Sequence, residues 1–212
     1  MTRAPSVLCV LRSGGIYDAE WVRKLRDAVG RHLSIAHRFA CLSDVDVPCE
    51  RIPLQHDWPR WWAKLELFKP GVITGPTLYL DLDTIVTGPL DILFDIEDDF
   101  AMLRNFREPH MVGSGVMWFK KPLLTPYTRF CEDPERAMQW YDVTGRNVSY
   151  LGDQAFIWDA MEQKVPMLDT DCIRSYKFHC THALPEGTSV VCFHGRPRPT
   201  EVGDDWVGEH WR

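Results

Sequence analysis

The sequence predicts an α/β fold in which a mostly parallel, mixed central sheet is flanked by helices on both faces. Three observations carry this prediction. Short apolar runs of strand length alternate with segments whose apolar residues recur at helical spacing. Polar clusters follow several of these runs directly, as they do at the carboxyl ends of strands in open α/β sheets. The 212 residues contain no internal repeat and no low-complexity linker, which favours one domain spanning residues 1–212.

The first half is predicted to open with a strand, a glycine turn and a helix. Residues 6–11 form a continuous apolar run, typical of a buried parallel strand, and Ser13-Gly14-Gly15 closes it. Between residues 22 and 33 the apolar side chains recur at helical spacing, with charged residues between them. The elements expected next are strands at 38–42 and 51–54, a helix around 62–68 that Pro70-Gly71 ends, and a strand at 77–80.

The second half is predicted to continue the alternation. Strands are expected at 100–103 and 116–119, with a polar loop at 104–114 between them. A helix is expected at 153–162, followed by a last strand at 189–193. That strand leads into the segment His194-Gly195-Arg196-Pro197-Arg198-Pro199.

Composition excludes several classes of protein. The formal net charge of −6 argues against a dedicated nucleic-acid-binding protein, because phosphate backbones select a basic surface. No stretch approaches the roughly 18 apolar residues of a membrane span. The seven cysteines include no Cys-x-x-Cys pair, and residues 1–5 do not resemble a signal peptide. We therefore expect a cytoplasmic protein with reduced thiols.

An Asp-x-Asp triplet is the first candidate for a metal site. The chain contains three, at 44–46, 81–83 and 169–171, and about two would occur by chance at this composition. Only Asp81-Leu82-Asp83 directly follows a buried apolar strand. Two carboxylates at such a strand end repel each other and lose hydration, so a cation, Mg²⁺ or Mn²⁺, would stabilise them. The alternative is that both aspartates cap a turn before Thr84.

His194 and the arginines after it extend the candidate site. An imidazole beside two carboxylates favours Mn²⁺ over Mg²⁺, and Gly195 permits close approach of backbone to a ligand. Arg196 and Arg198 stand between prolines and are candidate hydrogen-bond donors to a diphosphate. The alternatives are a core histidine satisfied by backbone and a solvated surface loop.

Several landmarks occur in an order that resembles a known family. They are Tyr79-Leu80-Asp81-Leu82-Asp83, Gly113-Ser114-Gly115-Val116, Gly152-Asp153-Gln154 and the segment 193–199. Together with the opening strand, turn and helix, they look like glycosyltransferases of the GT-A fold, of the glycogenin and lipopolysaccharide galactosyltransferase kind (family 8-like). The resemblance spans most of the chain. It implies a single-domain, Rossmann-like GT-A fold and a UDP-sugar donor, with Mn²⁺ held by Asp81, Asp83 and His194.

The resemblance also assigns candidate nucleotide-sugar contacts. The turn with Ser13, Gly14 and Tyr17 would hold the base, and Asp44 would contact uracil or ribose. Asp81 would also face the ribose, and Lys64 would lie near the diphosphate. Three further candidates come from the residues themselves and not from the resemblance. Gly115 would let backbone approach the donor sugar, with a simple tight turn as the alternative; Lys177 would assist the diphosphate, with an ordinary surface lysine as the alternative; and Gly195 lets backbone approach a ligand.

Asp153 and Gln154 are the candidate catalytic residues. They begin the predicted helix, so Asp153 as an N-cap is the structural alternative. In the functional interpretation, Asp153 deprotonates an acceptor hydroxyl in an inverting reaction or binds sugar hydroxyls in a retaining one. The sequence leaves both roles open.

Other functions compete with glycosyl transfer. A nucleotidyltransferase also pairs a glycine turn with metal-binding carboxylates, but Ser13-Gly14-Gly15 is followed by no Lys or Arg until Arg23. A non-catalytic, zinc-stabilised domain would use the cysteines and histidines between Cys172 and His194, which lack the usual close spacing.

The expected acceptor is a saccharide or glycoconjugate, and a modified DNA base stays open. Trp58 and Trp61 are candidates for holding an acceptor or a partner chain, whereas Trp62 is expected in the core. The donor sugar and the oligomeric state are not predicted.

Overall fold

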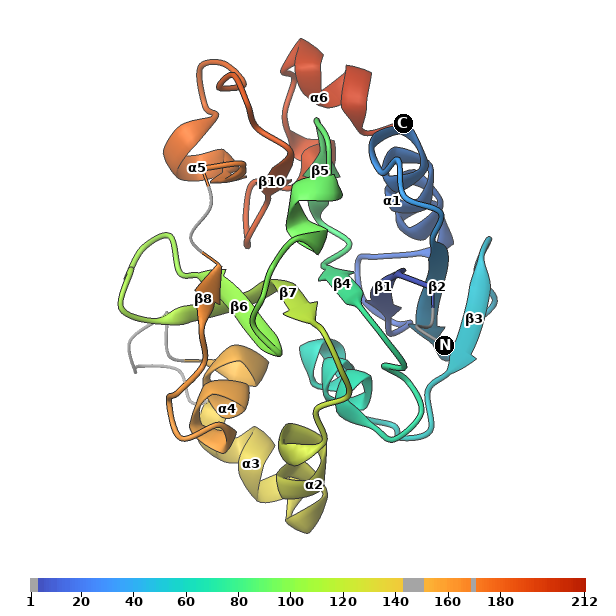
Figure 1. The fold of residues 1–212 in the computed structure, drawn as a ribbon, viewed down its shortest axis with the longest axis vertical. Coiled ribbons are helices and arrows are strands. Elements are labelled where there is room, and N and C mark those ends of the chain that lie inside the picture. Colours follow the sequence, from blue (N-terminus) through green and yellow to red (C-terminus); the bar gives the residue numbers. More distant parts are fainter. Residues whose placement is uncertain (1–3, 143–150, 169–170) are drawn as a thin grey trace.

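The computed structural model describes residues 4–142, 151–168 and 171–212 and confirms the α/β class (Figure 1). The strands are β1 (Ser6–Leu11), β2 (Arg38–Ser43), β3 (Glu50–Pro53), β4 (Thr77–Leu80), β5 (Thr84–Val86), β6 (Phe100–Arg104), β7 (Val112–Phe119), β8 (Met167–Leu168), β9 (Ile173–Ser175) and β10 (Val190–Cys192). The α-helices are α1 (Ala19–His32), α2 (Thr125–Glu132), α3 (Pro134–Tyr141), α4 (Gly152–Ala160), α5 (Tyr176–His179) and α6 (Asp205–His210). Three 3₁₀ helices are η1 (Arg60–Phe68), η2 (Asp91–Phe94) and η3 (Pro199–Glu201).

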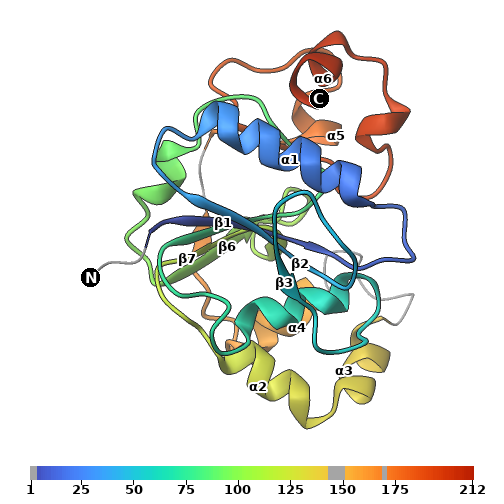
Figure 2. The same ribbon diagram turned by 90° about the vertical axis from the view of Figure 1, so that its right-hand side faces the viewer.

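A seven-stranded sheet with the order β3-β2-β1-β4-β7-β6-β8 forms the centre of the molecule. β1 pairs in parallel with β2 and β4, whereas β7 is antiparallel to both of its neighbours. β1 and β4 are buried almost throughout, as expected for strands covered on both faces. Figure 2 shows α1 on one face of the sheet and α2, α3 and α4 on the other.

A second, three-stranded sheet brings the C-terminal segment to the end of β4. β5 follows the Asp81-Leu82-Asp83 turn and pairs antiparallel with β10, so that Thr84 faces Cys192. The backbone N–H of Phe193 donates to the carbonyl oxygen of Asp83 at 3.0 Å. The strand predicted at 189–193 is therefore present as β10, and it lies in this small sheet with β5 and β9.

The segment predicted as a helix at 62–68 is the 3₁₀ helix η1, which is enclosed between the sheet, α2 and α4. Every residue from Trp62 to Phe68 is buried, including the charged Lys64 and Glu66. The Glu66 carboxylate accepts hydrogen bonds from the backbone N–H groups of Gln55, at 2.9 Å, and His56, at 2.8 Å. These bonds tie η1 to the loop after β3 and fix the positions of the side chains that η1 presents.

Some boundaries differ from the prediction. β7 begins at Val112, so Val112 and Gly113, expected in a polar loop, are already paired in the sheet, opposite Arg104 and Leu103. Glycines and a serine give a weak strand signal, and pairing with β6 outweighs it here. The helices α2, α3, α5 and α6 and the short strands β5, β8 and β9 were not predicted. Asp169 and Thr170 of the third Asp-x-Asp triplet lie outside the described residues.

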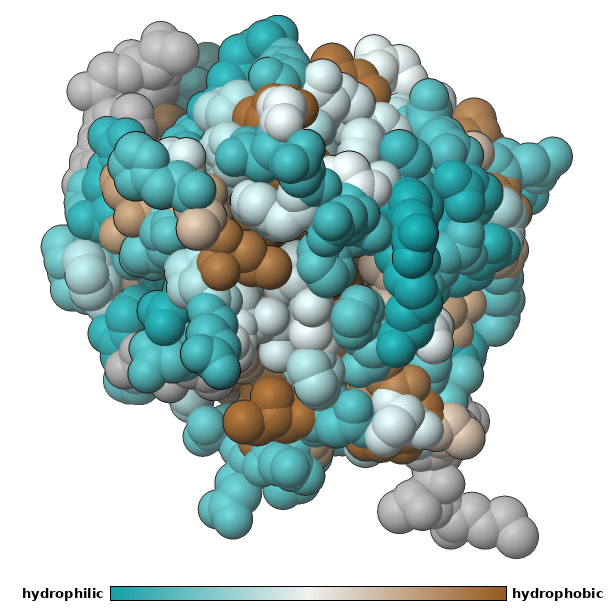
Figure 3. Space-filling model, turned by 90° about the horizontal axis from the view of Figure 1, so that it is seen from above, coloured by the Kyte–Doolittle hydropathy of each residue, from teal (hydrophilic) through white to brown (hydrophobic). Residues whose placement is uncertain are grey.

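In the described part of the chain, no helix is both long and apolar enough to cross a membrane. The face that carries α5 and α6 is mostly hydrophilic, with small, separate hydrophobic patches (Figure 3).

Candidate functional site

A cavity of about 950 Å³ opens at the carboxyl ends of β1 and β4. Its walls come from the turn after β1, η1, the turn after β4, the end of β6 with the loop after it, the start of β7, the first turn of α4, and the segments around α5 and β10. Most of the predicted site residues line it, namely Ser13, Gly14, Tyr17, Lys64, Asp81, Asp83, Gly115, Asp153, Gln154, Lys177, His194, Gly195 and Arg198. The topology thus brings residues from the whole length of the chain to the place where open α/β sheets bind ligands.

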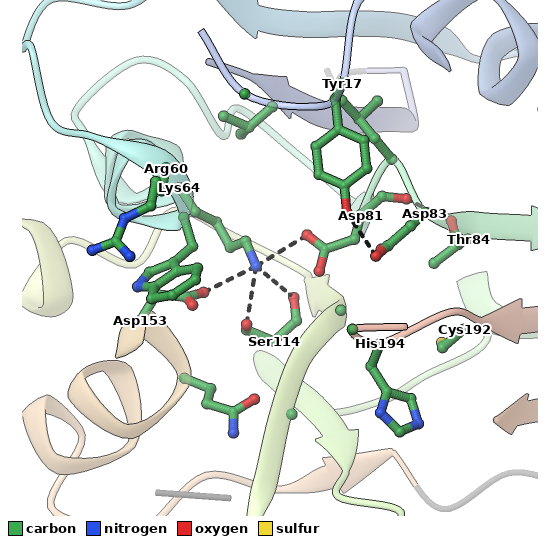
Figure 4. Close-up of a pocket in the computed structure, with 18 of the residues that line it drawn as sticks. Tyr17, Arg60, Lys64, Asp81, Asp83, Thr84, Ser114, Asp153, Cys192 and His194 are labelled. Atoms are coloured by element: carbon green, nitrogen blue, oxygen red, sulfur yellow. Dashed lines mark hydrogen bonds and ion pairs between the residues drawn. The ribbon is translucent and has the colours of Figure 1, made fainter. Parts of the chain in front are cut away.

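Lys64 lies at the centre of a buried polar network. Its Nζ is 3.0 Å from Asp81 Oδ1 and 2.9 Å from Asp153 Oδ2, and it donates to Ser114 Oγ at 3.0 Å (Figure 4). Burial alone would lower the pKa of Lys64, but the charges of Asp153 and Asp81 outweigh burial and raise it. The hydroxyl of Tyr79 also donates to Asp81, at 2.6 Å. Lys64 is therefore a buried cation that holds two carboxylates from distant parts of the chain.

Asp153 lies in the first turn of α4 rather than at its N-cap, which is Leu151. The capping alternative is therefore wrong, and the carboxylate of Asp153 serves the network around Lys64 instead. Gln154 lines the cavity beside it. Gly115 O accepts from the backbone N–H of Asp81 at 2.9 Å, which fixes the start of the Asp-x-Asp turn against β7.

Asp83 is also buried, and its environment differs from that of Asp81. The Tyr17 hydroxyl donates to Asp83 Oδ2 at 2.8 Å, and the Arg198 guanidinium contacts both Asp83 and Tyr17. Burial and the charge of Asp81 raise the pKa of Asp83 to about 7, although the Tyr17 bond and Arg198 oppose the shift. Burial and Asp83 in turn raise the pKa of Tyr17. Two crowded carboxylates with this electrostatic cost are a favourable place for an additional cation.

His194 lies at the same cavity but is turned away from the carboxylates (Figure 4). Its Nε2 is 2.7 Å from Ser175 Oγ, and its ring stacks on Phe106 at a centroid distance of 5.7 Å. Burial and the charges of Lys177 and Arg107 lower its pKa to about 4, so the imidazole is neutral at pH 7. The structure thus brings Asp81 and Asp83 together and leaves His194 hydrogen-bonded elsewhere.

Asp44 supports the turn after β1 from behind. Its carboxylate accepts from the backbone N–H of Ser13 and from Arg12 Nη1, each at 2.8 Å. Asp44 is absent from the cavity wall among the described residues, whereas Ser13, Gly14 and Tyr17 line it. Gly14 has a φ of 84°, which a glycine adopts without strain.

Two cations at the cavity form no ion pair with any other described residue. They are Lys177 in α5 and Arg107 in the loop between β6 and β7. Burial and the neighbouring charges of Arg107 and Arg198 lower the pKa of Lys177. Gly195 keeps space here, because a Cβ at this position would lie 3.2 Å from Lys177 Nζ. Arg196 points out of the site: its side chain is 81% exposed and pairs with Glu201.

Sequence reasoning missed four residues that shape the cavity: Arg12, Arg60, Tyr79 and Arg107. Tyr79 carried a usable signal, because residues two apart on a strand point to the same face and Tyr79 precedes Asp81 by two. The three arginines lie in or beside loops and carry no periodic signal.

The zinc alternative gains no support from the geometry. Across residues 4–142, 151–168 and 171–212, no three His, Cys, Asp or Glu side chains lie close enough together to hold a metal ion as they stand. In the Cys172–His194 region, His179 Nδ1 instead accepts from the backbone N–H of Ser175 at 3.0 Å, and Cys180 and Cys192 are buried thiols.

The described structure is similar to solved glycosyltransferases. Glycosyltransferase GlyE of Streptococcus pneumoniae TIGR4 matches with a TM-score of 0.64 and 17% identity, covering 94% of this chain and 56% of GlyE. Galactosyltransferase LgtC, in complex with donor and acceptor sugar analogues, matches with a TM-score of 0.61 and 15% identity, covering 97% of this chain and 96% of LgtC. The bifunctional glycosyltransferase WbbM matches with a TM-score of 0.61 and 12% identity, covering 92% of this chain and 46% of WbbM.

The chain has the GT-A glycosyltransferase fold. The fold expected from the sequence is thereby confirmed. The chain spans about half the length of GlyE and WbbM and nearly the whole of LgtC. No family model matches the sequence, and no curated protein matches it.

Proposed function

We propose that this protein is a metal-dependent glycosyltransferase that moves a sugar from a nucleoside diphosphate sugar, in the first place a UDP-sugar, to an acceptor hydroxyl. The observation that carries the proposal is the convergence of Asp81 and Asp153 on Lys64, with Asp83 beside Tyr17 and Arg198 in the same cavity. The cavity lies at the strand ends where α/β folds bind ligands. Similarity in fold to GlyE, LgtC and WbbM supports the reaction class without fixing it.

The two carboxylates offer part of the ligand set of a divalent cation, and a third ligand has to be recruited, because no three His, Cys, Asp or Glu side chains of the described residues are grouped as they stand. Asp81 and Asp83 offer hard oxygen ligands, and burial together with the charge of Asp81 raises the pKa of Asp83, a cost that a bound cation would offset. In our proposal His194 is the nitrogen ligand and gives up its hydrogen bond to Ser175 when it binds the metal. A neutral imidazole with two carboxylates favours Mn²⁺ over Mg²⁺. When bound, the ion acts as a Lewis acid that stabilises negative charge on the departing diphosphate.

The chain's own cations would assist the same charge development. Arg107, Lys177 and Arg198 line the cavity close enough together for the two arginines to lower the pKa of Lys177, after burial. An anionic donor bound there would be attracted by all three charges. Lys64 contributes a further positive charge and fixes Asp81 relative to Asp153.

We assign Asp153 and Gln154 to the donor sugar. Asp153 is buried and ion-paired, so its carboxylate is held in a fixed orientation suited to hydrogen bonds with sugar hydroxyls. The turn with Ser13, Gly14 and Tyr17 would receive the base, with Asp44 holding that turn in place.

The test is calorimetric titration with UDP in the presence and absence of Mn²⁺. We expect binding that requires Mn²⁺ and weakens by about tenfold or more in Asp83→Ala and in His194→Ala. Asp99→Ala is the matched control, because Asp99 is a surface carboxylate paired with Lys121 and lies outside the cavity. If neither UDP nor any other nucleoside diphosphate binds with the metal present, the proposed function is wrong.

A further inference from the structure

We propose that Trp61, with Arg60 stacked on it, is the binding platform for the acceptor, and that the acceptor is a neutral pyranoside. This inference rests on the proposed glycosyl transfer and adds the class of the second substrate. Three neighbouring tryptophans, Trp58, Trp61 and Trp62, differ in how far their side chains are exposed.

Trp61 is the exposed member of that group. It is 42% exposed and lines the cavity, whereas Trp58 is 8% exposed and Trp62 is fully buried. Trp58 and Trp62 pack against Phe130 in the core. A large aromatic ring left open at a cavity wall offers an apolar surface, which suits the C–H face of a sugar ring.

The indole of Trp61 is held in place by two unusual backbone positions. Gly152 has a φ of 63°, and a Cβ there would lie 2.8 Å from Trp61 Nε1, so the indole packs directly on the backbone of Gly152. Arg60 has a φ of 53°, which is uncommon for a residue with a side chain. Its guanidinium carbon lies 4.4 Å from the centroid of the Trp61 ring, and the guanidinium also pairs with Asp142. A positive φ costs a glycine no strain, so Arg60 alone is in a sparsely populated conformation, of the kind that clusters at ligand-binding sites.

The platform lies next to the group assigned to the donor sugar. Gly152, on which Trp61 packs, directly precedes Asp153. An acceptor on the indole would therefore be close to the part of the cavity where we place the transferred sugar. Such proximity is what an acceptor hydroxyl needs to meet the anomeric carbon.

The charges around Trp61 favour a neutral acceptor over a nucleic acid. Arg60 pairs with Asp142, and Arg12 pairs with Asp44 and Asp57. Lys64 is likewise occupied by two carboxylates. A phosphodiester chain would meet these paired carboxylates and no surplus of positive charge, so its electrostatic attraction would be weak here.

The test measures sugar binding by titration calorimetry in the presence of UDP and Mn²⁺. The probes are the methyl α- and β-pyranosides of D-glucose and D-galactose, with a single-stranded thymidine oligonucleotide as a separate arm. The variants are Trp61→Phe, which keeps an aromatic face, Trp61→Leu, which keeps only apolar volume, and Trp140→Leu as the matched control. Trp140 is 54% exposed and does not line the cavity.

We expect at least one pyranoside to bind the wild type. Affinity should fall about tenfold or more in Trp61→Leu, fall less in Trp61→Phe and stay unchanged in Trp140→Leu, while the affinity for UDP stays the same in all four proteins. Binding of UDP without any pyranoside would overturn the inference and leave the proposed function standing. Equal sugar affinity in the wild type and in Trp61→Leu would also overturn the inference and leave the proposed function standing. Binding of the oligonucleotide without any pyranoside would have the same two consequences. A wild-type protein that does not bind UDP in the presence of Mn²⁺ would overturn the proposed function and the inference with it.

Discussion

The two sides of the cavity handle positive charge in opposite ways. On the side formed by the turn after β1, η1 and α4, which we call the paired side, every cavity cation has a carboxylate partner: Arg12, Arg60 and Lys64 pair with Asp44, Asp57, Asp142, Asp81 and Asp153. On the side formed by the loop before β7 and by α5, which we call the unpaired side, Arg107 and Lys177 have no such partner among the described residues.

Cations that form ion pairs within the protein stabilise its structure, whereas cations without such a partner are available to bind a ligand. Buried ion pairs fix geometry, and they become costly when one partner is removed. Burial and the charges of Arg107 and Arg198 lower the pKa of Lys177, and an anionic ligand would offset both effects. The paired side should therefore respond to substitution with a loss of stability, and the unpaired side with a loss of ligand affinity.

The largest effect is expected for Lys64→Met. The substitution leaves Asp81 and Asp153 without their shared cation, so we expect the free energy of unfolding to fall by about 3–5 kcal/mol. Urea denaturation measures this change. Lys164→Met is the control, because Lys164 is 79% exposed and its pair with Glu162 should contribute little. A Lys64→Met protein as stable as the wild type would show that these ion pairs do not stabilise the paired side.

Gly152→Ala should have the next largest effect. An alanine at the positive φ of Gly152 costs about 1–2 kcal/mol in any surroundings, and here its Cβ would also collide with Trp61. Gly187→Ala is the matched control, since Gly187 has a φ of 77° and open space around it. Thermal unfolding should show Gly152→Ala to be the less stable of the two by about 1 kcal/mol or more. Equal losses would mean that the Trp61 ring moves aside freely and is not a fixed platform.

The sequence predicted residues at strand ends better than it predicted the contacts that those residues make. Apolar runs predicted β1, β4 and β10, and polar residues directly after them predicted where Asp81, Asp83 and His194 lie. These residues are near strand ends, so a local pattern places them. The pairing of β5 with β10, which brings His194 to the cavity, could not be predicted, because contacts between segments about a hundred residues apart leave no local signature.

The ion pairs of the paired side were also beyond sequence reasoning. Lys64 and Asp153 are 89 residues apart in the chain and meet only because η1 and α4 pack on the same face of the sheet. Asp44 was predicted to contact the nucleotide from its place after β2, and the structure instead shows its carboxylate bound to Ser13 and Arg12. Which partner a polar side chain selects depends on the tertiary structure, whereas its place at a strand end depends on the local pattern.

The smallest predicted effects test the unpaired side. Arg107→Ala and Lys177→Met should each weaken Mn²⁺-dependent UDP binding by about tenfold. Each substitution removes a positive charge that forms no ion pair within the described part of the protein and is therefore available to attract the diphosphate. The dependence of UDP affinity on salt concentration should become shallower in both variants. Their free energies of unfolding should stay within about 0.5 kcal/mol of the wild type, since no ion pair is broken. A loss of stability without a loss of affinity would reverse the contrast between the two sides, and calorimetry together with urea denaturation distinguishes the outcomes.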